Sequence, residues 1–257
     1  MNLKSSLKAK KKVLGCWNII PSPSISEIIG LAGFDFQIID MEHGGITLET
    51  AENMIRSIEI SNSSSLLRVP SNDASFIQRA LETGVHGIVV PNISSAQEAE
   101  QAVKACKYFP DGTRGFSPFT RSGRYVSDNA TELARGKNEE TVVVLLVEGT
   151  KGLNNLSDIL KVPNIDVIYL GLYDISQSIG HPGNLDHPKV IEYIEHCVKL
   201  ILGAGLTPGT IAINDSKLEW LMSLGFGFIA YQADCSILSK ATTRIAQQFK
   251  TLSSTQT

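Results

Sequence analysis

Five residues with charged or titratable side chains come at the end of short apolar runs in this sequence. They are Asp40, His43, Arg68, Glu148 and Asp174. Carboxylates bind hard divalent cations, a guanidinium pairs with a carboxylate, and an imidazole moves protons near neutral pH. Collected in one place, these groups could perform metal-assisted chemistry on an acidic substrate.

Glu148 and Asp174 are the candidate metal ligands. Glu148 ends the apolar run that starts at Val142, and a carboxylate in such a buried position needs a partner. A structural ion pair with Lys or Arg would satisfy it, and so would a divalent metal shared with Asp174. Oxygen ligands suit Mg²⁺, Mn²⁺ or another hard ion, so both alternatives stay open at this point.

Arg68 and His43 are candidates for substrate binding and proton transfer. Arg68 follows an apolar run and precedes Pro70. It could bind a substrate carboxylate, or it could form a salt bridge with Glu148 or Asp174. His43 stands three residues after Asp40, which could orient the imidazole and raise its basicity. The alternative is a lone histidine in a turn.

The segment Pro110–Lys137 is polar and rich in Arg and Gly. A loop of this length in a compact domain is usually functional or disordered. Its residues Arg114, Arg121 and Arg124 could form an anion-binding rim. A structural or subunit-contact role is an equally open interpretation for each of them.

Eight apolar, β-branched runs are predicted to be the strands that position these residues. They are Val13–Ile19, Phe36–Asp40, Ser65–Val69, Gly87–Val90, Val142–Glu148, Val167–Gly171, Leu206–Thr210 and Gly227–Tyr231. Runs that are apolar almost throughout suit parallel strands covered by helices. Their number favours a single (β/α)8 barrel, in the TIM-barrel class, over a doubly wound sheet. In such a barrel the active site lies at the carboxyl ends of the strands.

Amphipathic stretches between these runs are predicted to be helices. They are Ser24–Leu31, Asp73–Thr83, Ser94–Lys107, Ile191–Leu202 and Ile237–Phe249. The first is expected to start with a capping box made by Ser24 and Glu27. Glycines at 33, 84 and 225 follow helical stretches, where a left-handed residue is wanted.

The composition is that of a globular protein. The chain has 257 residues, 42% hydrophobic and 19% charged, with a net charge of −3. We therefore predict one domain over 1–257, no nucleic-acid partner and no membrane span. The four cysteines have no C-x-x-C spacing and are expected to be buried thiols. The amino terminus lacks the apolar core of a signal peptide, so a cytoplasmic location is expected.

An ordered set of segments resembles the HpcH/HpaI class II 2-oxo acid aldolases, relatives of the citrate lyase β subunit. The similarity is to enzymes of the 2,4-dihydroxyhept-2-ene-1,7-dioate and 2-dehydro-3-deoxyglucarate aldolase type. The segments are Gly15-Cys-Trp17, Asp40-Met-Glu-His43-Gly44, Arg68-Val-Pro70, Gly84-Val-His-Gly-Ile-Val-Val-Pro91, Gly112-Thr-Arg-Gly115, Val147-Glu148 and Gly171-Leu-Tyr-Asp-Ile-Ser-Gln-Ser-Ile-Gly180. Each is weak alone, but together they extend over about 15–231 in the same order.

The resemblance implies a metal-dependent lyase that reversibly cleaves a 4-hydroxy-2-oxo acid to pyruvate and an aldehyde through a metal-stabilised enolate. It implies Mg²⁺, Mn²⁺ or Co²⁺ on Glu148 and Asp174. Arg68 would contact the 2-oxo acid and its enolate, and His43 with Asp40 would transfer protons. Trp17 and the backbone at Gly171, Leu172 and Tyr173 would complete the substrate site. It also implies a homo-oligomer, a hexamer or trimer, in which the last helix, after Ala233, packs on a neighbouring subunit.

Two positions depart from the family pattern. The family often carries Gln where this chain has Leu146, and Gly-Pro-Ala-Asp where it has Gly171-Leu-Tyr-Asp174. A bulky Tyr173 and an apolar Leu146 would reshape the pocket and leave the second substrate open.

Two other functions compete with the aldolase. One is a condensing enzyme that acts on oxaloacetate and an acyl-CoA, like a citrate synthase, or a citramalyl-type lyase on the same fold. The other is a barrel that binds a metabolite for regulation. The complete set of charged residues at the predicted strand ends argues against a barrel that only binds a metabolite for regulation.

Overall fold

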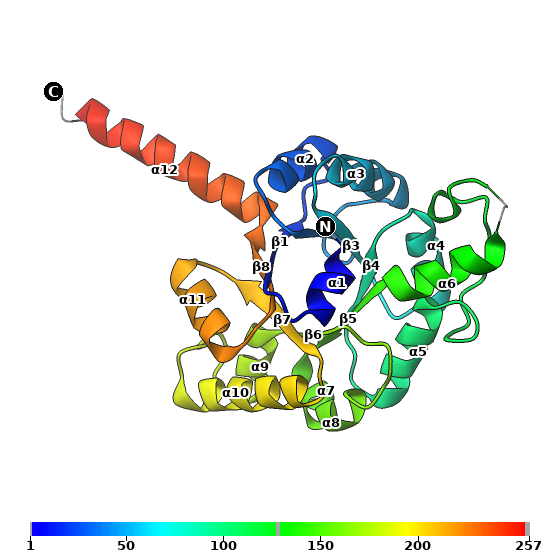
Figure 1. Cartoon of the computed structure of the whole chain (residues 1–257). Helices are drawn as coiled ribbons and strands as arrows, with labels where there is room; N and C mark the ends of the chain where they lie inside the picture. Colours follow the sequence, from blue (N-terminus) through cyan, green and yellow to red (C-terminus); the bar gives the residue numbers. More distant parts are fainter. Residues whose placement is uncertain (1, 127–128, 255–257) are drawn as a thin grey trace.

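The computed structural model describes residues 2–126 and 129–254. Eight parallel strands close into a barrel in chain order (Figure 1). The strands are β1 (Val13–Asn18), β2 (Phe36–Asp40), β3 (Ser64–Arg68), β4 (Gly87–Val90), β5 (Val142–Val147), β6 (Val167–Leu170), β7 (Thr207–Ala212) and β8 (Phe228–Ala233). The predicted (β/α)8 barrel is therefore confirmed, and each predicted strand is present within two residues at either end.

Helices surround the barrel and cover its outer face (Figure 1). They are α1 (Leu3–Lys8), α2 (Pro23–Leu31), α3 (Leu48–Ile60), α4 (Ala74–Glu82), α5 (Ala96–Cys106), α6 (Ala130–Glu140), α7 (Gly149–Asn154), α8 (Leu156–Ile159), α9 (Leu172–Ser178), α10 (Pro188–Gly203), α11 (Asp215–Leu224) and α12 (Asp234–Ser254). A 3-10 turn, η1, spans Arg121–Gly123.

Some helix ends agree with the predictions from the sequence and others differ. Asp73, the first residue of the predicted stretch, caps α4 by accepting the N–H of Phe76. The cap of α2 is Ser22, which accepts the N–H of Ile25, so the capping box of Ser24 and Glu27 was wrong. Pro23 explains the difference, because proline favours the first helical position, which places the cap at Ser22, two residues before Ser24. The glycines at 33, 84 and 225 all have positive φ, as expected.

The segment Pro110–Lys137 is not the continuous loop that its polarity suggested. It contains η1 and most of α6, while positions 127–128 lie outside the described residues. The sequence of α6 is strongly polar, and in the structure none of its residues is buried. A helix without an apolar face gives no periodic signal, which is why it was missed.

The apolar core has two layers. One fills the barrel interior and includes Phe36 and Phe228, whose rings stack at 3.8 Å. The other lies between the strands and the surrounding helices. Helix α1 closes the amino-terminal end of the barrel, since Leu3 and Leu7 pack into the interior layer. Lys4 fixes this lid by donating to Thr141 O at 2.7 Å and pairing with Asp166 at 2.9 Å.

The four cysteines are free thiols. Three are buried as expected, and burial raises the pKa of Cys16 and Cys106 to about 12. Cys235 is exposed, so the expectation was wrong for that residue. Within the described residues, none of the helices combines the length and apolar character required to cross a bilayer.

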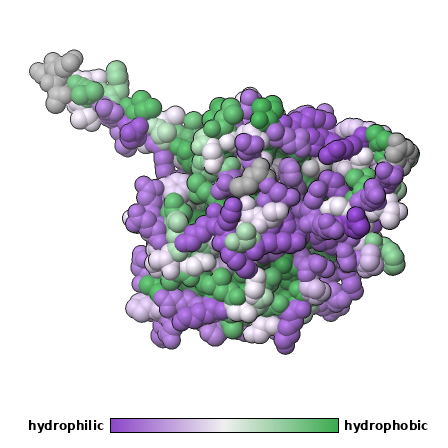
Figure 2. All heavy atoms as spheres, in the orientation of Figure 1, coloured by the Kyte–Doolittle hydropathy of each residue, from purple (hydrophilic) through white to green (hydrophobic). Residues whose placement is uncertain are grey.

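Helix α12 leaves the barrel and projects away from it (Figure 1). Its root is fixed by Asp234, whose carboxylate accepts the backbone N–H groups of Ile19 and Ile20, both at 3.0 Å. In the described part of this helix, Asp234 is the only buried residue. Apolar side chains are exposed along the rest of its length (Figure 2).

Candidate active site

A cavity of about 280 Å³ opens at the carboxyl ends of the strands. The five residues singled out for chemistry all line it. Its lining is Trp17, Ile19, Asp40, His43, Arg68, Leu146, Glu148, Tyr169, Leu170, Gly171, Leu172, Tyr173, Asp174, Ile211 and Ala233. Because these strand ends meet at one rim of the barrel, residues more than 100 positions apart converge there.

Glu148 and Asp174 face the same small volume above Gly171. Glu148 follows β5 and precedes α7, while Asp174 lies in the first turn of α9 after β6. A Cβ built on Gly171 would lie 2.9 Å from Asp174 Oδ2 and 3.5 Å from Glu148 Oε2. The two carboxylates therefore approach each other across the backbone of a glycine, where any side chain would collide with them.

Burial and neighbouring carboxylates dominate the electrostatics of Glu148, and the charge of Arg68 has the smallest effect on its pKa. Burial raises its pKa, and the negative charge of Asp174 raises it further. The N–H of Asn92, which donates to Glu148 Oε1 at 3.2 Å, acts in the opposite direction. A bound cation would relieve the repulsion between Glu148 and Asp174.

The two carboxylates fit a divalent cation that keeps open coordination positions. The described residues contain no group of three or more His, Cys, Asp or Glu side chains arranged around one ion. Mg²⁺ is commonly held by one or two carboxylates while water and substrate fill the other positions. The donor set is therefore sufficient for such an ion but not for a closed structural site.

Arg68 is held by two other carboxylates. Asp40 and Arg68 stand opposite each other at the ends of β2 and β3. Asp40 accepts from Arg68 Nε at 2.9 Å and from Nη2 at 2.5 Å, and Arg68 Nη1 lies 2.9 Å from Glu42 Oε2. The guanidinium also lies 4.4 Å from the centre of the Trp17 ring. The alternative of a salt bridge from Arg68 to Glu148 or Asp174 is thus replaced by pairs with Asp40 and Glu42.

Asp40 fixes the turn that carries His43. Its Oδ1 accepts the backbone N–H of Glu42 at 3.0 Å and of His43 at 3.1 Å. Among the described residues, the carboxylate makes its side-chain hydrogen bonds with Arg68 and none with the His43 imidazole. Asp40 therefore positions His43 through the backbone, and the exposed imidazole is free to reach the cavity.

Glu42 and Asn92 were not predicted from the sequence. Asn92 has a left-handed φ of 59° just after β4, and its side chain lies 3.4 Å from Glu42 Oε1. Its backbone N–H donates to Glu148, so one residue links the two acidic groups. The sequence held only a weak signal, an Asn soon after an apolar strand, because Asn is one of the residue types that tolerate a positive φ.

Apolar side chains form the rest of the cavity. Leu146 comes two residues before Glu148 on β5, points into the barrel and is 3% exposed. Tyr169 is buried beside it and accepts a hydrogen bond from Trp17 Nε1 at 2.9 Å. Tyr173 is 44% exposed at the mouth. Apart from Arg68, none of the described residues of the lining is a Lys or an Arg.

Arg114, Arg121 and Arg124 do not form a rim around this cavity. Arg114 is buried with its guanidinium 4.3 Å from the centre of the Tyr108 ring. Arg121 donates to Thr83 O at 3.0 Å, at the turn that precedes β4. That turn belongs to the amino-terminal end of the barrel, opposite the cavity.

Known proteins are similar to this chain in both sequence and structure. The sequence model of the HpcH/HpaI aldolase/citrate lyase family matches residues 14–241. A 5-keto-4-deoxy-D-glucarate aldolase of Escherichia coli O6:H1 is 30% identical over 247 residues, covering 96% of each chain.

Two solved structures share the fold at full length. An HpcH/HpaI aldolase from Desulfitobacterium hafniense DCB-2 has a TM-score of 0.91 and 28% identity, and 97% of each chain is covered. The citrate synthase SbnG has a TM-score of 0.88 and 26% identity, with 98% of this chain and 99% of that chain covered.

Proposed function

The chain belongs to the HpcH/HpaI aldolase/citrate lyase family, and we propose that it reversibly cleaves a 4-hydroxy-2-oxo acid to pyruvate and an aldehyde. Its relatives are named as aldolases, which supports carbon–carbon lyase chemistry. The acid named for them, 5-keto-4-deoxy-D-glucarate, is one candidate substrate of this class.

The main support for this proposal is that acidic and basic side chains line the same cavity. The carboxylates of Glu148 and Asp174, the guanidinium of Arg68 and the imidazole of His43 all line this cavity. Cleavage next to a 2-oxo acid places negative charge on the 2-oxo oxygen. A divalent cation held by Glu148 and Asp174 would act there as a Lewis acid.

Arg68 is positioned to stabilise the same charge. Its guanidinium is fixed by Asp40, Glu42 and the Trp17 ring, so it is aimed before the substrate arrives. Preorganised charge of this kind costs no reorganisation during the reaction. The first backbone amides of α9, at Leu172 and Tyr173, have no acceptor within their own helix and are suited to hold the substrate carboxylate.

His43 is the residue proposed to move the proton of the 4-hydroxyl group. Its imidazole lines the cavity from the turn after β2, and an imidazole is the side chain most often used for general acid–base catalysis. Glu148 and Asp174 are assigned to the cation and Asp40 is paired with Arg68, so His43 is the residue of the original candidate set left to transfer the proton. No lysine lines the cavity among the described residues, and the mechanism proposed here does not use a Schiff base.

Proton exchange at pyruvate tests the proposal without knowledge of the aldehyde. We expect purified protein with Mg²⁺ in D₂O to exchange the pyruvate methyl protons, followed by ¹H NMR, and to lose this activity in EDTA. Glu148→Gln and Asp174→Asn should each slow exchange by about 100-fold or more. Glu192→Gln on α10, an exposed carboxylate far from the cavity, is the matched control. Unchanged exchange in EDTA or in Glu148→Gln contradicts the proposal.

Condensation with an acyl-CoA is the second candidate. It is favoured by the structural match to the citrate synthase SbnG over nearly the whole chain. Incubation with acetyl-CoA and oxaloacetate would release free CoA in this case, which a thiol reagent detects. Absence of CoA release, together with cleavage of an aldol panel, would decide for the aldolase.

A further inference from the structure

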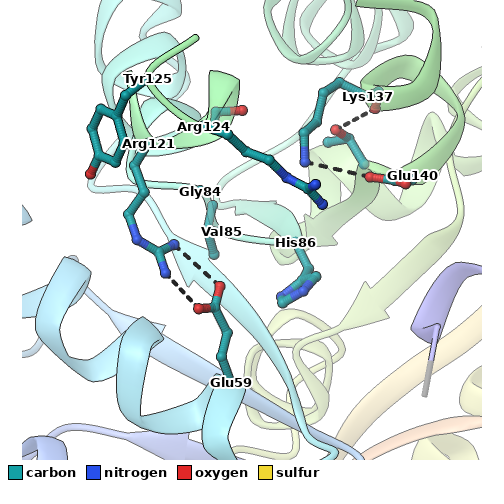
Figure 3. A pocket seen from close by; sticks show the side chains of 11 residues that line it. Glu59, Gly84, Val85, His86, Arg121, Arg124, Tyr125, Lys137 and Glu140 are labelled. Carbon is teal, nitrogen blue, oxygen red and sulfur yellow. Dashed lines mark hydrogen bonds and ion pairs between the residues drawn. The ribbon is translucent and has the colours of Figure 1, made fainter. Parts of the chain in front are cut away.

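A second cavity, of about 540 Å³, lies at the amino-terminal end of the barrel. His86 and Thr141, which directly precede β4 and β5, form its floor. Arg121 and Arg124 line it from η1 and the residue after it, and Lys137 lines it from α6 (Figure 3). Its volume is within the range of small-molecule sites, and none of the proposed catalytic residues lines it.

The charges of this cavity do not cancel. Arg121 is matched by Glu59 through an ion pair of 2.5 Å and is also anchored to Thr83 O. Among the described residues, the only partner of the Lys137 ammonium is Glu140, which also lines the cavity, at the long distance of 3.4 Å. The Arg124 side chain has no ion pair or hydrogen bond with any residue of 2–126 or 129–254. One guanidinium and one loosely paired ammonium are thus available to a negatively charged group.

His86 adds a neutral hydrogen-bond donor. The backbone N–H of Ser65 donates to His86 Nδ1 at 3.2 Å, so Nδ1 is an acceptor and the proton lies on Nε2. Enclosure by the surrounding protein lowers the pKa of His86, which keeps the ring neutral. No residue in the described part of the chain accepts from Nε2–H, and His86 lines the cavity.

The backbone at Arg124 supports a functional role. Arg124 and the next residue, Tyr125, have φ values of 57° and 60°. Two successive residues with side chains in the left-handed region are costly, and such conformations concentrate at binding and catalytic sites. Here the conformation brings Arg124 over the cavity, and Figure 3 shows it pointing to the same region as Lys137, while His86 lies below them at the floor.

We propose that this cavity binds a small oxyanion, the carboxylate or phosphate group of a metabolite, between Arg124, Lys137 and the Nε2–H of His86. A guanidinium offers two parallel donors to such a group, an ammonium adds a point charge, and the imidazole supplies a directed hydrogen bond. The Arg121–Glu59 pair forms the wall of the site and is not needed to balance the ligand charge. The site is distinct from the cavity at the carboxyl ends of the strands.

Isothermal titration of the full-length protein at low salt, with inorganic phosphate and separately with succinate, tests the site. We expect one anion per chain to bind for at least one of the two probes, and the comparison tells phosphate from carboxylate preference. Arg124→Gln should weaken binding by at least tenfold, and Lys137→Gln should weaken it in the same direction. Arg244→Gln, an exposed arginine on α12, is the matched control and should keep the wild-type affinity.

Competition separates this site from the proposed active site. Saturating pyruvate should leave the binding of the probe unchanged, because pyruvate would occupy the opposite end of the barrel. Displacement of the probe by pyruvate, equal affinity in wild type and Arg124→Gln, or no binding of either probe would each overturn the proposal. These outcomes do not depend on aldolase activity, so the two proposals can fail independently.

Discussion

At the scale of single residues, Arg68 combines a planar fork with a fixed position. Asp40 receives two of its donors, Glu42 faces a third, and Trp17 stacks beside the guanidinium. A lysine keeps the positive charge but cannot bond to Asp40 through two parallel donors. We expect Arg68→Lys to fold but to lower kcat about 100- to 1000-fold, the loss typical when a donor to a developing oxyanion is removed.

The stability of this variant distinguishes a catalytic loss from a structural one. Asp40 is fully buried, so removal of its cationic partner altogether would cost about 3–5 kcal/mol of unfolding free energy. Arg68→Lys should cost less, because an ammonium remains beside the carboxylate. A denaturant titration alongside the kinetics checks this, and a kcat within threefold of wild type would remove Arg68 from the mechanism.

Leu146 is expected to decide which aldehydes the cavity accepts. It presents an apolar surface two residues before Glu148, where similar aldolases often carry Gln. An apolar wall cannot hydrogen-bond a hydroxylated or charged aldehyde, and burial of such groups without partners is costly. We expect Leu146→Gln to raise kcat/KM for polyhydroxylated aldehydes relative to apolar ones by about tenfold, equivalent to about 1.4 kcal/mol.

A paired comparison of glyceraldehyde and butyraldehyde as acceptors measures this ratio. Leu172→Met, which keeps an apolar side chain in the same lining, is the matched control and should leave the ratio unchanged. A ratio that does not move in Leu146→Gln would show that another surface selects the aldehyde.

At the scale of elements, the sequence predicted the barrel because parallel buried strands leave a strong pattern. The strands are almost entirely buried, and Asp40, Arg68 and Glu148 mark the carboxyl ends of β2, β3 and β5. Helix α6 and the cap of α2 were not predicted correctly, because their sequence signals are local and weak. The ion pairs of Arg68 were not predicted either. Asp40 lies opposite Arg68 because of the strand register, and apolar runs in the sequence do not reveal the register.

Lys107 makes the end of α5 sensitive to pH. The residue is 1% exposed, and its ammonium donates to Asn138 O at 2.7 Å and Thr141 O at 3.0 Å. Burial, followed by the charge of Lys4, lowers the pKa of Lys107 to about 8. The unfolded chain, with a pKa of about 10.4, then binds more protons between those values, so this residue makes the unfolding free energy rise with pH across that window.

The change is limited to about 3 kcal/mol between about pH 8 and pH 10.4. Below pH 8, Lys107 is charged in both the folded and the unfolded state, so it adds no pH dependence to the unfolding free energy. Comparing the denaturant midpoints of wild type and Lys107→Met at pH 7.0 and 9.5 isolates the effect, since other titrating groups are common to both. The unfolding free energy of the wild type should rise relative to that of Lys107→Met at the higher pH. A constant difference in unfolding free energy would show that Lys107 keeps an ordinary pKa.

At the scale of the whole molecule, α12 carries apolar side chains that are exposed beyond its buried root. Leu238, Ile245 and Phe249 are 51%, 59% and 71% exposed, and their spacing of seven and four residues puts them on one face. Asp234 anchors the root to β1, so the helix is held outward (Figure 1). An apolar stripe of this kind marks a contact surface, and we predict that it packs on a second copy of the chain.

Charge on that stripe should therefore break the assembly. Burial of each large apolar side chain contributes about 1.5–3 kcal/mol, and an interface buries the same helix from both copies. We expect wild type to be a homo-oligomer by light scattering coupled to size exclusion at micromolar concentration, and the double variant Ile245→Glu/Phe249→Glu to elute as a smaller species with unchanged far-UV circular dichroism. Gln247→Glu adds charge on the opposite face and should leave the assembly intact. A wild type that is already monomeric, or a double variant of unchanged mass, would mean that α12 serves another purpose.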